Sequence, residues 1–80
     1  MSNADKLLDQ MRRNPRDWRI DDLFVVAASV GLIVRPAKGS HVKFSYPHML
    51  LQIAVPTRRP IREIYIRKFV ELVEEVLTKS

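Results

Sequence analysis

The chain has 80 residues, which is enough for one domain with one small hydrophobic core. Hydrophobic residues make up 46% of it, which argues against disorder, and the lack of cysteine excludes a disulfide framework and a thiolate zinc site. Fourteen Lys and Arg against nine Asp and Glu give a formal net charge of +5, which favours a polyanionic partner such as nucleic acid or an acidic protein surface.

The longest apolar stretch, residues 23–34, is too short to span a bilayer, and it lies too deep in the chain for a signal peptide. We therefore expect no membrane association. A reducing, cytoplasmic location fits a chain without cysteine.

The first predicted element is a short helix within an N-terminal extension, residues 1–19, and the main domain is predicted to cover residues 20–80. Asn14-Pro15 ends this helix. Its apolar face is formed by Leu7, Leu8 and Met11.

A second helix is predicted to run to Val30, with Asp21 or Asp22 as its N-terminal cap. Gly31 can supply the left-handed residue that ends it. The apolar residues that recur at helical spacing are Ile20, Leu23, Phe24 and Ala27.

Three short strands are predicted to follow, at Leu32–Arg35, His41–Tyr46 and Leu50–Val55. Side chains alternate along a strand, so His41 and Lys43 should lie on the face opposite Phe44. We therefore expect an accessible histidine at the start of the second strand, directly after the Gly39-Ser40 turn.

Pro60 is predicted to start the last helix, whose apolar stripe must cover one face of the sheet. The stripe consists of Ile61, Ile64, Tyr65, Phe69, Leu72, Val73, Val76 and Leu77. The order helix, three antiparallel strands, helix predicts an α+β fold, a double-stranded-RNA-binding-domain-like sandwich of α-β-β-β-α order with the sheet packed on the helices.

Cationic residues gather near the predicted turn and after the third strand, and we expect them to contact RNA phosphates. They are Lys38, Lys43, Arg58 and Arg59. Ser40 could hydrogen-bond a phosphate or shape the turn.

His41 is the candidate catalytic residue, because histidine can accept or donate a proton near neutral pH. No carboxylate stands between Asp22 and Glu63, and His48 is seven residues from His41. The sequence therefore predicts no metal site and no cofactor near His41.

The segment Gly39-Ser40-His41 followed by Phe44, the strand ending in Val55-Pro56 and the amphipathic helix 61–77 resemble the HicA family of bacterial toxins. The resemblance covers roughly residues 20–77. It implies an mRNA-cleaving endoribonuclease without a metal, which requires His41 and is held inactive by a HicB antitoxin. Many relatives have a histidine soon after the Val-Pro pair, where this chain has Thr57-Arg58-Arg59, so the second proton-transfer group is open.

Two other functions fit the residues. One is a catalytically inactive RNA-binding module on the same fold, which the missing second histidine favours. The other is a protein-interaction domain whose basic face binds an acidic antitoxin-like partner.

Overall fold

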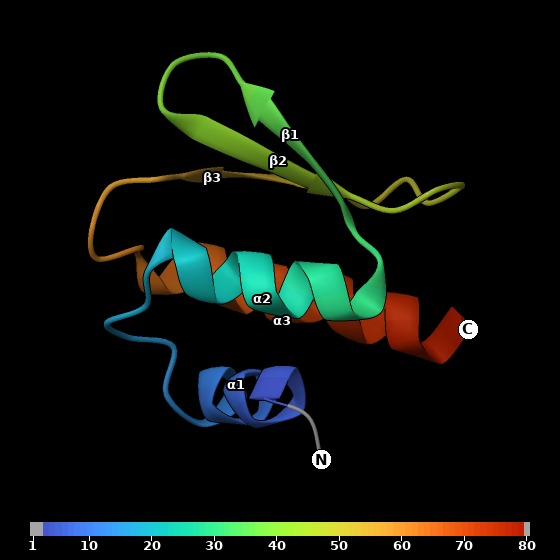
Figure 1. Ribbon diagram of the computed structural model, residues 1–80, viewed down its shortest axis with the longest axis horizontal. Helices are drawn as coiled ribbons and strands as arrows, with labels where there is room; N and C mark the ends of the chain where they lie inside the picture. Colours follow the sequence, from blue (N-terminus) through green and yellow to red (C-terminus); the bar gives the residue numbers. More distant parts are fainter. Residues whose placement is uncertain (1–2, 80) are drawn as a thin grey trace.

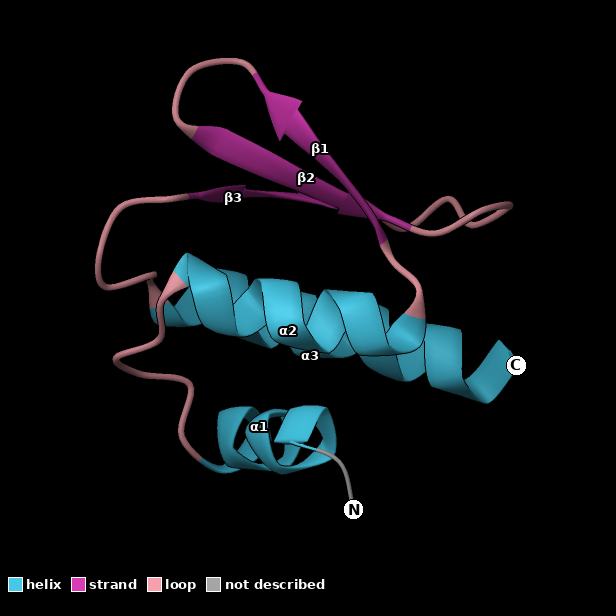
Figure 2. Ribbon diagram, viewed as in Figure 1, coloured by secondary structure: helices cyan, strands magenta, loops and turns pink. Residues whose placement is uncertain are grey.

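A computed structural model describes residues 3–79, so the ends of the predicted extension and domain, residues 1–2 and 80, lie outside the described residues. In chain order the elements are α1 (Asn3–Arg13), α2 (Ile20–Val30), β1 (Ile33–Ala37), β2 (His41–Ser45), β3 (Ile53–Pro56) and α3 (Glu63–Lys79). Figures 1 and 2 show three layers: the antiparallel sheet, the pair α2 and α3 beneath it, and α1 on the far side of that pair. The α+β class is confirmed: α1 is the helix predicted in the N-terminal extension, and α2 to α3 follow the predicted helix, three strands, helix order.

Helix α1 packs onto the rest of the chain. Leu8 and Met11 are buried and belong to the same hydrophobic core as the sheet and α3. Trp18, in the connection to α2, is partly buried against this core, and its Nε1 donates to the carbonyl of Asn14 at 2.7 Å. Burying the ring while its N–H keeps a partner is the usual arrangement for tryptophan.

Helix α2 begins at Ile20 with Arg19 as the N-cap residue, so the predicted cap at Asp21 or Asp22 is wrong. Asp22 instead lies in the first turn, where its Oδ2 accepts a hydrogen bond from the backbone N–H of Arg19 at 3.1 Å. The predicted end is confirmed, since Gly31 has a φ of 79° and follows the last helical residue.

The sheet has the order β1-β2-β3. β1 begins at Ile33 and continues through Pro36 to Ala37, residues that the sequence predicted to be a turn. Proline is tolerated there because β1 is an edge strand.

β3 starts at Ile53, so the predicted start at Leu50 is wrong, and Leu50 is 99% exposed in the connection. The pairing with β2 ends at Phe44 and Ile53, and beyond it the N–H of Met49 donates to the carbonyl of Tyr46 at 3.2 Å in a turn. The ladder therefore stops before Leu50 is reached.

The core lies between the sheet and the helices. Phe44 on β2 and Phe69 on α3 are both fully buried, with ring centroids 5.1 Å apart in an edge-to-face arrangement. α3 begins at Glu63 rather than at Pro60, because the N–H of Ile61 donates to the carbonyl of Trp18 at 2.9 Å in an isolated bridge. Among residues 3–79, no helix is both long and apolar enough to cross a membrane.

Candidate functional site

The structure places His41 at the start of β2 with its side chain exposed. Along β2, Val42 and Phe44 pack against the core, whereas His41 and Lys43 are exposed, as the alternation predicted. The turn before His41 contains Gly39 at a φ of 72°, a left-handed conformation that glycine adopts without strain.

Hydrogen bonds between Ser40 and Thr57 also hold the start of β2 in place. The carbonyl oxygen of Ser40 accepts hydrogen bonds from the backbone N–H of Thr57 at 2.9 Å and from its Oγ1 at 3.1 Å. Thr57 thereby anchors the chain that follows β3 beside His41.

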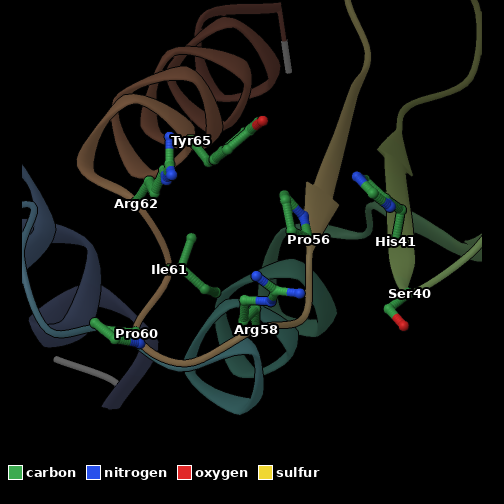
Figure 3. Close-up of a pocket in the computed structure, with 8 residues that line it drawn as sticks. All are labelled: Ser40, His41, Pro56, Arg58, Pro60, Ile61, Arg62 and Tyr65. Atoms are coloured by element: carbon green, nitrogen blue, oxygen red, sulfur yellow. The ribbon is translucent and has the colours of Figure 1, made fainter.

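His41 faces a cavity of about 300 Å³ that opens between β2, the end of β3 and the start of α3. Pro56 and Ile61 form its apolar walls, and the ionisable side chains around it are His41, Arg58, Arg62 and Tyr65. Figure 3 shows these groups approaching the cavity from different elements, with Arg58 on the loop after β3 and Tyr65 on α3. The cavity thus combines a histidine, two guanidinium groups and a phenol.

The predicted site residues divide into two groups. Ser40, His41 and Arg58 lie at the cavity, although Figure 3 shows the hydroxyl of Ser40 directed away from the other side chains. The cations outside the cavity lining are Lys38 in the turn before β2, Lys43 on β2 and Arg59 beside Arg58, all of them exposed.

Arg62 and Tyr65 are functional candidates that the sequence did not assign to the site. Tyr65 was placed in the apolar stripe of the last helix, and its partly buried ring does pack against the core. Its position three residues after Arg62 puts both side chains on one side of the helix start. This three-residue spacing, close after Arg58 and Arg59, is the pattern in the sequence that could have identified Arg62 and Tyr65 as site residues.

The carboxylate of Glu63 does not neutralise the positive charges of Arg58 and Arg62 at the cavity. Its carboxylate pairs with Arg67 and, at 3.3 Å, with Arg16. The hydrogen bond from Arg67, with help from Arg16, lowers the pKa of Glu63. Within the described chain, Arg58 and Arg62 have no ion-pair partner, so their charges remain available to an anion.

His48 lies beyond the other end of β2 and does not join His41. It has a φ of 65° in a turn that the hydrogen bond from the N–H of Met49 to the carbonyl of Tyr46 closes at 3.2 Å. Across residues 3–79, no group of three or more His, Asp or Glu side chains is placed to hold a metal ion.

Comparisons of the chain with protein families, with curated proteins and with solved structures found no match.

Proposed function

We propose that this chain is an endoribonuclease that cleaves mRNA by means of its own side chains, as the toxin of a HicA-like toxin-antitoxin pair in the cytoplasm. The observation that carries the proposal is the cavity in which the exposed His41 stands with the unpaired Arg58 and Arg62 and the hydroxyl of Tyr65. The antiparallel order β1-β2-β3 with helices on one face supports the finer assignment to a double-stranded-RNA-binding-domain-like fold.

RNA cleavage by this route needs two proton transfers. His41 removes the proton of a ribose 2′-hydroxyl, whose oxygen attacks the adjacent phosphorus. The bond from phosphorus to the 5′-oxygen of the next nucleotide breaks, and that oxygen takes a proton. The products are a 2′,3′-cyclic phosphate and a free 5′-hydroxyl. Arg58 and Arg62 stabilise the negative charge that builds on the phosphate oxygens.

Tyr65 is the best placed donor of the second proton. The cavity lining offers no second histidine and no carboxylate, and the hydroxyl of Ser40 points away. The Tyr65 hydroxyl makes no hydrogen bond to another described residue, so it is free to meet a substrate oxygen. Tyr65 therefore fills the role that the missing histidine left open.

A basic toxin of this kind can be silenced by an acidic partner that covers the histidine and the phosphate-binding cations together. A HicB-like antitoxin is accordingly the proposed protein partner. We expect it to bury His41, Lys43 and Arg58 and to compete with RNA.

The competing function is a catalytically inactive RNA-binding module. It is favoured by Thr57, which has a structural hydrogen bond where a second histidine would be expected. In that case RNA binds and is not cut.

The test is cleavage of an end-labelled mRNA by the purified protein in the presence of EDTA. The wild type should give fragments that end in 2′,3′-cyclic phosphate, and His41→Ala should give none. His48→Ala is the matched control and should cleave like the wild type. Equal cleavage by His41→Ala, or loss of cleavage in EDTA, would contradict the mechanism; binding without cleavage by the wild type would establish the inactive module.

A further inference from the structure

The charges of this chain are separated by layer. Residues 23–62, which comprise most of α2, the whole sheet and the approach to α3, contain six Lys and Arg and no Asp or Glu. The ion pairs seen between described residues join helices or the α1–α2 connection: Arg12–Glu74, Arg13–Asp9, Arg16–Glu63 and Arg67–Glu63. The rest of the chain carries eight Lys and Arg against nine Asp and Glu and is close to neutral, so the net positive charge lies in the sheet layer.

Two of these unpaired cations lie side by side on the outer face of the sheet. The register pairs Arg35 of β1 with Lys43 of β2, and residues paired in this way project from the same face. Both side chains are exposed. Like charges directly opposite each other destabilise a sheet, so folding gives no reason for this pair.

The pair is continuous with the cavity. His41 lies two residues before Lys43 on the same face of β2, which sets their backbone positions about 7 Å apart along the strand. That spacing is close to the length of one nucleotide in an extended strand. Figures 1 and 2 show no helix over this face of the sheet, so a ligand could pass from the cavity onto it.

The remaining residues of this face are mostly small. Ala54 pairs with Lys43, and Ala37 and Pro56 flank His41 in the register. They leave the backbone of the sheet accessible, and they include no aromatic ring on which a base could stack. The surface is thus suited to phosphates rather than to bases.

We infer that the outer face of the sheet, through Arg35 and Lys43, binds the phosphates of the single-stranded RNA segment adjoining the nucleotide held at His41. The inference rests on the proposed function for its choice of RNA as the ligand. It predicts contacts that are independent of sequence and sensitive to salt.

The test measures binding without cleavage. The probe is a fluorescent 2′-O-methyl oligoribonucleotide, which cannot be cut because the attacking oxygen is blocked. Its affinity for the wild type and for the double variant Arg35→Gln, Lys43→Gln is measured by anisotropy across a range of salt concentrations. Two lost phosphate contacts should lower the slope of log affinity against log salt by about 1.4. The control is Lys6→Gln, Lys79→Gln, which removes the same charge from exposed positions on α1 and α3 and should retain most of the wild-type slope.

A slope equal to that of the wild type in the Arg35 and Lys43 variant would overturn the inference. Equal reductions in the two double variants would also overturn it, because they would show an effect of net charge alone. If the sheet-face variant keeps RNA binding and loses binding to an acidic protein instead, the face is a protein interface. Absence of RNA cleavage by the wild type would reject the proposed nuclease and leave this binding result to be judged separately.

Discussion

Replacing Phe44 tests the link between the core and the site, because this residue holds β2 against α3. Its side chain is fully buried, and its ring meets that of Phe69 at 5.1 Å. Truncation to alanine costs about 3–5 kcal/mol in a comparable core position. An 80-residue domain has a free energy of unfolding of about 4–12 kcal/mol, so Phe44→Ala should leave the domain barely folded or unfolded.

Phe44→Leu keeps an apolar side chain and makes the prediction measurable. It loses the aromatic contact and some volume, at about 1–2 kcal/mol, which should lower the melting temperature by about 5–15 °C. The assay is thermal unfolding followed by circular dichroism. The matched control is Val34→Ala, because Val34 is the cross-strand partner of Phe44 but is 40% exposed. It should cost less than about 1 kcal/mol. A control as destabilised as Phe44→Leu would show that β2 is not anchored through its buried face.

Two further predictions concern the turn before His41 and the start of α3. Gly39→Ala should destabilise the protein by about 1–2 kcal/mol in a thermal melt, because a φ of 72° is unfavourable for a residue with a side chain. Steric contact adds little to this cost, since the nearest atom to the added Cβ would be His41 Nδ1 at 3.9 Å. A rise in melting temperature would contradict the prediction. Glu63→Gln should destabilise the protein at neutral pH, and the difference should disappear in acid. This pH dependence follows from the lowered pKa of Glu63 in the folded protein. The ion pairs of Glu63 with Arg67 and Arg16 stabilise the fold above about pH 4.5, and this stabilisation is lost as the pH falls through the lower folded-state pKa. The measurement is the melting temperature of the wild type and of Glu63→Gln across this pH range. A difference between them that stays constant with pH would contradict the prediction.

Local patterns in the sequence were enough to predict β2 and its orientation. The alternation of Val42 and Phe44 with His41 and Lys43 depends only on the two-residue period of a strand, and the structure confirms it. The end of α2 at Gly31 was likewise predictable, because a left-handed glycine is a local signal.

The errors came from contacts between distant segments. The start of β3 depends on its pairing with β2, which ends at Phe44 and Ile53 and leaves Leu50 outside the ladder. The start of α3 depends on Trp18, which engages the N–H of Ile61 from a connection more than forty residues away in the chain. Neither partner can be identified from the local pattern.

The candidate site was predicted in part for the same reason. His41, Ser40 and Arg58 stand out by residue type and by position next to predicted strand ends. Tyr65 fits the apolar stripe of α3 equally well, and only the packing of that helix beside β3 shows that its ring borders the cavity. The 3.6-residue period of apolar side chains identifies the buried face of a helix, but it does not show which surface the hydroxyl of a tyrosine on that face reaches.

In the proposed mechanism, His41 and Tyr65 divide the two proton transfers of RNA cleavage. It is tested most directly by comparing a dinucleotide with a uridine 3′-(4-nitrophenyl phosphate), whose leaving group needs no proton. We predict that His41→Ala loses activity on both substrates, whereas Tyr65→Phe loses at least about 100-fold on the dinucleotide and keeps near wild-type activity on the nitrophenyl ester. Equal losses on both substrates in Tyr65→Phe, or full activity of His41→Ala on either substrate, would contradict the account.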